Sequence, residues 1–137
     1  MSKPAFHHTQ LTVADLDRSR AFYRDVLGLK ELPRPKFPFP GAWFELANGQ
    51  ELHIVNVPGV LPRGLEVMQI YESHIAIRVQ SFQQALELLH AHGYREDVAD
   101  DDSRKMVIKP HPPTGYPQVY FLDPDRYLFE FNAAVLD

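Results

Sequence analysis

The sequence predicts an α+β fold in which two tandem βαβββ modules form a curved mixed sheet with a central cleft. The main observation is a repeat. The strand-like segment at residues 8–13 (HTQLTV) has the same pattern of His, aliphatic residue and Val as the segment at residues 74–79 (HIAIRV). Each copy is followed by a helix-like segment and then by further strand-like segments. A chain of 137 residues is long enough for one compact domain. We therefore expect a single domain at 1–137, with module 1 at about 1–60 and module 2 at about 70–137.

The first module is expected to contain one helix and four strands. After the strand at 8–13, Asp15 can cap a helix whose apolar stripe ends at Leu27, and Gly28 supplies its stop. Strand-like segments follow at 29–32, 42–46 and 51–57, with a turn at Asn48-Gly49. Prolines between residues 32 and 40 exclude a central strand there, so this stretch is a loop.

The second module repeats the order of the first. Ser81 and Gln84 resemble a capping box, and Gly93 ends the helix that they begin. A long excursion is expected from about 97 to 117, with prolines at 110–117, before strands near 118–122 and 127–132 that a turn at 123–126 joins. The proline loops of the two modules are expected to flank one cleft.

The composition excludes several classes of function. The net charge of −4 comes from mixed signs, and the one dense charged run, at residues 96–102, is acidic, so nucleic acid is not an expected partner. The lack of Cys excludes disulfides, thiolate nucleophiles and sulfur-ligated zinc. The first residues lack the apolar run of a secretory signal, and no apolar run approaches the roughly 18 residues of a membrane helix. We expect a cytoplasmic protein without a membrane partner.

Four polar side chains are expected to converge from the two modules. His8 and His74 open the repeated strands and face away from the apolar layer, because side chains alternate along a strand. His53 and Glu130 occupy matching positions in the last strand of each module, each between two large apolar residues. The first and last strands of a βαβββ module lie side by side, so all four side chains are expected on the concave side.

Three imidazoles and one carboxylate are a suitable ligand set for one divalent metal ion per site. Without thiolates the candidates are Zn, Ni, Co, Mn and Fe. Four protein ligands leave two octahedral positions for a small substrate that chelates through oxygen. The alternative at each position is a hydrogen-bonded structural residue, and His53 depends further on the placement of the Asn48-Gly49 turn. His90, His92 and His111 are not expected to be ligands.

Other side chains are candidates for binding substrate: Arg78, Trp43, Phe39 and Tyr116. Arg78 follows His74 on the same face and could meet an anionic group, although an ion pair with Glu45 or with an acidic loop residue is the alternative. Trp43 and Phe39 could line an apolar pocket or pack against the other module or a second subunit. Tyr116 lies in the excursion and could act from a lid.

Several segments resemble the vicinal oxygen chelate superfamily, which contains glyoxalase I, bleomycin-resistance proteins and extradiol dioxygenases. The similar segments are residues 8–13 with Asp15-Leu16, Ser19, Ala21-Phe22-Tyr23 and Leu27-Gly28-Leu29, residues 41–44 with 50–54, and residues 121–125 with Glu130. Together they cover nearly the whole chain. They specify the superfamily rather than a reaction, because isomerases, epimerases, thiol transferases, oxygenases and non-catalytic drug binders share this scaffold.

The resemblance implies a metal on His8, His74 and Glu130, with His53 as a fourth ligand, in a protein that we expect to be a homodimer. In glyoxalase I the carboxylate that corresponds to Glu130 takes and returns the substrate proton while the metal holds the enediolate oxygens, so Glu130 is the candidate catalytic residue.

The sequence departs from glyoxalase I at three positions and from the wider superfamily at a fourth. His53 stands where Glu or Gln is usual, and Thr12 and Val57 stand where an Arg and an Asn grip the carboxylates of glutathione. These differences argue against lactoylglutathione as the substrate. Arg126 stands where the superfamily commonly has Gly.

Three functions follow as hypotheses. The leading one is a divalent-metal-dependent, glyoxalase-like lyase or isomerase that acts on a small oxygen-chelating substrate through a metal-stabilised enediolate or oxyanion. An alternative from another class is a non-catalytic resistance protein that binds an antibiotic or aromatic ligand. A third is an Fe(II) extradiol-type dioxygenase, which requires His53 to stay off the metal because substrate and dioxygen need three open positions.

Overall fold

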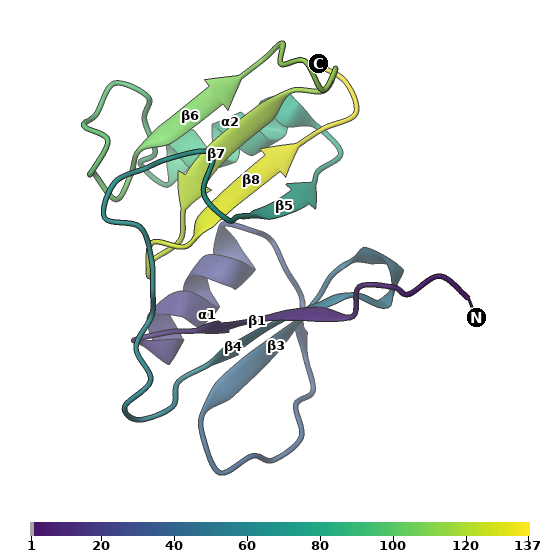
Figure 1. The fold of residues 1–137 in the computed structure, drawn as a ribbon, viewed down its shortest axis with the longest axis vertical. Helices are drawn as coiled ribbons and strands as arrows, with labels where there is room; N and C mark the ends of the chain where they lie inside the picture. The colour runs from purple at the N-terminus through teal and green to yellow at the C-terminus, as the bar shows by residue number, and fades with distance from the viewer. Residues whose placement is uncertain (1) are drawn as a thin grey trace. The chain divides into compact units, whose positions relative to one another are not determined.

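A computed structural model describes residues 2–137, and the chain divides into two compact units at residues 62 and 63. Each unit has the element order strand, helix, strand, strand, strand (Figure 1). The predicted α+β class and the two βαβββ modules are therefore confirmed. No helix within residues 2–137 is both long and apolar enough to span a membrane.

Unit 1 consists of a mixed four-stranded sheet and one helix. Its elements are β1 (His8–Thr12), α1 (Leu16–Asp25), β2 (Glu31–Leu32), β3 (Gly41–Glu45), a 3-10 turn (Ala47–Gly49) and β4 (Glu51–Val55). The strand order is β1-β4-β3-β2, with β1 parallel to β4 and the other pairs antiparallel. The expected pairing of first and last strand is confirmed, and it sets His8 opposite Glu51 and Gln10 opposite His53.

Unit 2 repeats this topology with its own strands. Its elements are β5 (Ile75–Arg78), α2 (Phe82–Ala91), β6 (Met106–Lys109), β7 (Gln118–Leu122) and β8 (Leu128–Asn132). The order is β5-β8-β7-β6, with β5 parallel to β8, and Figure 1 shows α2 against one face of this sheet. The register sets Ala76 opposite Glu130.

The helices begin where the sequence predicts. The Asp15 carboxylate accepts a hydrogen bond from the backbone N–H of Arg18 (3.0 Å), and the Ser81 hydroxyl accepts one from the N–H of Gln84 (3.1 Å). Both helices bury an apolar stripe, and α1 contacts β3 and β4 while α2 contacts β8. The buried residues of the stripes are Phe22, Tyr23 and Val26 in unit 1 and Phe82, Ala85 and Leu89 in unit 2.

One strand was missed by the sequence analysis. Residues 106–109 form β6, although they were assigned to the excursion, and that assignment is wrong. The strand pairs with β7, which places Met106 opposite Phe121. The Met106 side chain is almost completely buried. A run of three apolar residues between an acidic stretch and a proline loop carries little local signal, so its strand conformation depends on the partner strand.

The segment that precedes β5 covers part of the sheet of unit 2. Met68 is buried with Tyr120, Leu122 and Leu128, and Leu65 and Ile70 pack against this cluster. Arg126 fixes the segment, because its guanidinium donates to the carbonyl oxygens of Leu65 and Glu66. Arg126 has a positive φ of 67°, a backbone conformation that favours Gly, and these hydrogen bonds offset the cost of placing Arg there.

Candidate metal centre

Unit 1 brings two of the four predicted ligands into contact. The imidazole rings of His8 and His53 stack with their centroids 4.4 Å apart and their planes 16° apart. His8 is exposed, whereas His53 is buried. The Nδ1 atoms of His8 and His7 lie 2.8 Å apart, so one donates to the other and the Nε2 of His8 remains for a further contact.

His53 lies between two rings and is oriented by a carboxylate. Trp43, its neighbour in β3, stacks on it with centroids 4.2 Å apart and planes 5° apart. Its Nε2 donates to the Oε1 of Glu51 at 3.1 Å. A carboxylate accepts but does not donate, so this bond places a proton on Nε2, and Nδ1 is the ring nitrogen with a free lone pair in the neutral ring.

Unit 2 brings the other two ligands together with a defined tautomer. The Nε2 of His74 lies 3.1 Å from the Oε2 of Glu130. The Nδ1 of His74 lies 2.8 Å from the carbonyl oxygen of Glu72, which can only accept, so Nδ1 carries a proton. In the neutral ring two lone pairs therefore face each other, and such a pair requires a cation between them, either a proton or a metal ion.

Glu130 is buried, and its other oxygen is already engaged. The side-chain amides of Gln118 and Asn132 each donate to Oε1 at 2.9 Å. Tyr120 lies opposite Glu130 in β7, and burial, with the charge of Glu130 and a hydrogen bond to it as lesser causes, raises the pKa of Tyr120 to about 12. The phenol therefore stays protonated at neutral pH and can donate to the Glu130 carboxylate, whose Oε2 faces His74.

The structure thus assembles the predicted ligands as two pairs, one in each unit. Considered separately, neither unit gathers three His, Asp or Glu side chains around a point that a metal could occupy, within residues 2–137. That the two pairs meet at one ion stays a prediction.

The predicted substrate-binding residues fall into two local groups. The guanidinium of Arg78 lies over the ring of Tyr116, 4.8 Å from its centroid. In unit 1, Phe37 lies beside both other candidates, with its centroid 5.4 Å from that of Phe39 and 6.2 Å from that of Trp43. The substrate-binding roles of Arg78, Tyr116, Phe39 and Trp43 stay predictions.

Sequence reasoning missed the residues that hold the ligands. Gln118 and Asn132 lie on the same face as Glu130, and Glu51 lies on the same face as His53. The signal was present, because polar residues at alternate positions of otherwise apolar strands indicate a shared polar face. The carbonyl of Glu72 could not have been found, because a backbone acceptor leaves no trace in the sequence.

Known proteins with similar chains include a metallothiol transferase, a glyoxalase/dioxygenase and a fosfomycin resistance protein. The chain is 28% identical over 144 residues to the metallothiol transferase FosB of Lysinibacillus sphaericus. The alignment covers 99% of this chain and 86% of the relative. A glyoxalase/dioxygenase from Nostoc punctiforme superposes with a TM-score of 0.71 at 25% identity, over 94% of this chain and 90% of the other.

A third relative was solved with a metal. A variant of the fosfomycin resistance protein FosX of Listeria monocytogenes, in complex with Mn(II) and a dihydroxypropylphosphonic acid, superposes with a TM-score of 0.66 at 25% identity, over 99% of this chain and 95% of the other. The family model for these proteins matches residues 5–131, nearly the whole chain. The protein therefore belongs to the glyoxalase/bleomycin resistance protein/dioxygenase superfamily.

Proposed function

We propose that this protein is a divalent-metal-dependent enzyme that acts on a small substrate with two adjacent oxygen atoms, with a glyoxalase-like lyase or isomerase as the leading reaction class. The observation that carries the proposal is the pair formed by Nε2 of His74 and Oε2 of Glu130, 3.1 Å apart. The backbone contact at Nδ1 fixes this tautomer, as is usual for histidines that bind metals.

The residues that would hold the ion are His8, His53, His74 and Glu130. Imidazole nitrogens and a carboxylate oxygen suit Zn, Ni, Co, Mn or Fe, so the donor set fits the metal that the superfamily implies. A complete site requires the pair of unit 1 and the pair of unit 2, from the same chain or from two chains. When bound, the ion would act as a Lewis acid for adjacent substrate oxygens.

Glu130 is the residue proposed to move a proton. Gln118 and Asn132 hold its Oε1, so Oε2 is the oxygen that can accept a proton from a substrate carbon and return it. Tyr120 cannot serve as the base at neutral pH, because its pKa of about 12 keeps it protonated. It acts instead as a donor that orients the Glu130 carboxylate.

A second candidate function is metal-dependent antibiotic resistance, in which a thiol or water adds to a compound such as fosfomycin. Similarity to the metallothiol transferase FosB and to the fosfomycin resistance protein FosX favours it. The proposed ligands are the same, so the two candidates differ in the substrate and not in the metal centre.

Metal analysis of the purified protein tests the part that both candidates share. We expect one divalent ion per site in the wild type, and loss of that ion in His8→Ala and in Glu130→Ala, because each removes one donor. His90→Ala is the matched control, since His90 is exposed near the end of α2. Metal-free wild-type protein that still binds a small ligand would instead indicate the non-catalytic resistance protein.

Activity assays then separate the reaction classes. Loss of the methylglyoxal–thiol adduct, followed with several thiols, reports the leading class, and consumption of fosfomycin with the same thiols reports the second. Oxygen uptake with catechols reports an extradiol dioxygenase. We expect turnover in one of the first two assays, and its loss in Glu130→Gln.

A further inference from the structure

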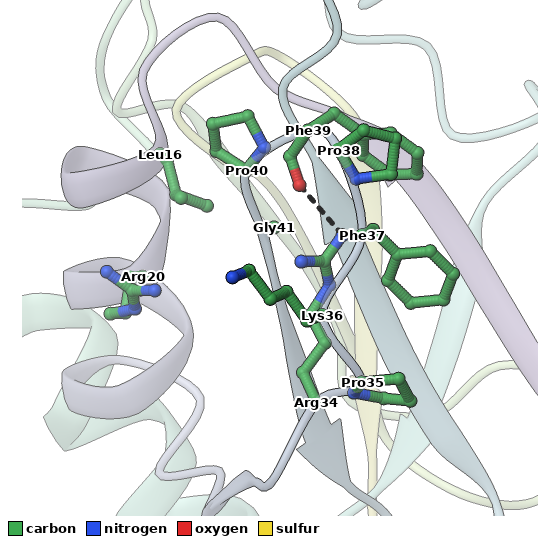
Figure 2. A pocket seen from close by; sticks show the side chains of 10 residues that line it. All are labelled: Leu16, Arg20, Arg34, Pro35, Lys36, Phe37, Pro38, Phe39, Pro40 and Gly41. Carbon is green, nitrogen blue, oxygen red and sulfur yellow. Dashed lines mark hydrogen bonds between the residues drawn. The ribbon is translucent and has the colours of Figure 1, made fainter.

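Unit 1 contains an open groove between α1 and the proline loop that precedes β3. Its volume is about 670 Å³, and its lining includes the side chains of Leu16, Arg20, Arg34, Lys36, Phe37 and Phe39 (Figure 2). Figure 2 shows Lys36 extending from the loop toward the side of α1, while Phe37 lies on the other side of Arg34. The groove therefore combines cationic and aromatic side chains.

Two of the three cations in this groove lack a carboxylate partner. Arg20 is neutralised, because its guanidinium lies 3.0 Å from Glu31 and 3.4 Å from Asp17. No carboxylate among residues 2–137 lies within 4 Å of the cationic nitrogens of Arg34 or Lys36. The groove consequently carries uncompensated positive charge although the whole chain is acidic.

Arg34 is held in place with donors unused. Its guanidinium carbon lies 4.6 Å from the centroid of Phe37 and 5.3 Å from that of Phe39, and its Nη2 donates to the Phe39 carbonyl at 3.2 Å. Gly41 makes room for it, because a Cβ there would lie 2.8 Å from that nitrogen. The Nε of Arg34 is buried without a partner in the described chain. The guanidinium is thus fixed and partly dehydrated, which strengthens its attraction to an anion.

A row of rings joins this groove to the histidine pair of unit 1. Phe37 neighbours Trp43, Trp43 stacks on His53, and His53 stacks on His8. An apolar or aromatic group that lies on Phe37 and Trp43 would therefore extend from Arg34 toward the proposed metal ligands.

We propose that this groove binds the oxyanion of the substrate, a carboxylate, phosphate or phosphonate group, through Arg34 and Lys36, and that the apolar or aromatic body of the substrate lies on Phe37 and Trp43. The substrate class is thus a small amphipathic anion whose far end reaches His8 and His53. This inference rests on the proposed function of those two histidines.

Binding of phenylphosphonate tests the inference directly. Trp43 is the only tryptophan of the chain, so its fluorescence reports a ring that enters beside it. We expect saturable quenching by phenylphosphonate that weakens as NaCl is added, and much weaker quenching by neutral benzyl alcohol. Equal affinity for the neutral compound would overturn the proposal.

Charge removal identifies the residues. Lys36→Gln and Arg34→Gln should each weaken phenylphosphonate binding at least about tenfold, because each removes a charge-assisted contact. Lys36 is exposed and contacts no carboxylate among residues 2–137, so its substitution leaves the fold intact even if Arg34→Gln unfolds. Lys30→Gln is the matched control, since Lys30 is an exposed lysine of unit 1 outside the groove. Unchanged affinity in Lys36→Gln would refute the role of the groove.

Two further measurements separate this inference from the proposed metal function. His8→Ala should lose metal and keep phenylphosphonate binding, whereas Lys36→Gln should keep metal and lose binding. If phenylphosphonate binding disappears in His8→Ala and survives in Lys36→Gln, the anion binds at the metal. That outcome would refute the proposal that the groove binds it. If the wild-type protein binds phenylphosphonate in the groove but never takes up metal, the proposed enzyme function is wrong and the groove inference still holds.

Discussion

The two carboxylate oxygens of Glu130 have different environments, and the difference bears on the proposed chemistry. Oε1 accepts from the amides of Gln118 and Asn132, whereas Oε2 faces Nε2 of His74. A buried carboxylate without such donors would be costly to keep charged. The amides therefore hold the side chain in one orientation and leave Oε2 to a cation or a proton.

Replacement of Gln118 by Leu should weaken the metal site without removing a ligand. We expect metal affinity to fall about 10- to 100-fold, because residues that orient ligands commonly contribute this much. We also expect the free energy of unfolding to fall by about 1 to 3 kcal/mol, since Oε1 loses one donor in a buried position. Competition with a chelator and urea unfolding measure the two effects.

Asn132→Leu removes the second donor to the same oxygen and should reproduce both effects. Gln83→Leu is a suitable control, because Gln83 is exposed on α2. Metal affinity that is unchanged in Gln118→Leu and Asn132→Leu would show that Oε1 has no part in the site.

Residues of the candidate site were predictable where their positions in the two halves of the chain match. His8 and His74 begin equivalent strands, and His53 and Glu130 are central in equivalent strands, so the repeat indicates all four. The contacts that set their tautomers were not predictable, because the carbonyl of Glu72 and the carboxylate of Glu51 act through geometry rather than through a motif.

At the scale of elements, Tyr94 joins the end of α2 to the sheet of unit 2. Its side chain is fully buried, and its hydroxyl donates to the carbonyl oxygen of Leu122 in β7 at 2.5 Å. Its ring meets that of Phe121 at an edge, with centroids 5.7 Å apart. The contact spans two elements that are far apart in sequence, so it stabilises their packing rather than either one alone.

This contact predicts a loss of stability at alkaline pH. Burial raises the pKa of Tyr94 to about 12, whereas an unfolded tyrosine ionises near 10, so the folded state keeps its proton over a range in which the unfolded chain loses it. The stabilisation is present below about pH 10 and is lost as the pH rises toward 12. Denaturant unfolding at a series of pH values measures it.

Tyr94→Phe should reduce the fall in the free energy of unfolding between pH 10 and 12. At neutral pH it should lower the free energy of unfolding by about 1 kcal/mol, because the hydrogen bond is lost. Tyr120, whose pKa is also raised to about 12, accounts for a further part, so Tyr94→Phe combined with Tyr120→Phe should flatten the decline more than either change. The free energy of unfolding can be compared between pH 10 and 12 in the wild type, the two single variants and the double variant. If it falls equally steeply in all four, the two tyrosines do not cause the loss of stability.

The elements that the sequence predicted best are those with local signals. Asp15 and Ser81 begin the two helices, Gly28 and Gly93 follow them with positive φ, and the apolar stripes are buried as expected. Strand β6 has no comparable signal and was missed. The packing of residues 65–70 was missed as well, because it depends on Arg126, which a sequence reading could identify only as an unusual turn residue.

At the scale of the whole molecule, the duplicated architecture distributes the proposed site equally. Unit 1 contributes the His8 and His53 pair, and unit 2 contributes the His74 and Glu130 pair. The repeat predicted this division from the sequence. That the two pairs meet at one ion stays a prediction, because no local motif in the sequence describes it.

The segment that links the units exposes large apolar side chains, which predicts a homodimer. The exposed fractions are 50% for Val60, 76% for Leu61, 52% for Val67 and 89% for Tyr71. Apolar side chains that are concentrated in one exposed segment commonly mark a contact surface with a partner. We therefore expect the protein to sediment with twice the 15.8 kDa mass of one chain.

Leu61→Ser combined with Tyr71→Ser should shift the sedimentation of the protein toward the monomer, because both side chains lose the apolar area that association would bury. Val135→Ser is the matched control, since Val135 is 67% exposed but lies near the other end of unit 2 in sequence. Circular dichroism of each variant checks that the fold is kept. At 100 µM, even a weak dimer with a Kd of roughly 10 µM is mostly associated. A wild-type protein that sediments as a monomer at this concentration would contradict the prediction. Unchanged dimerisation in the double variant would move the contact surface away from this segment.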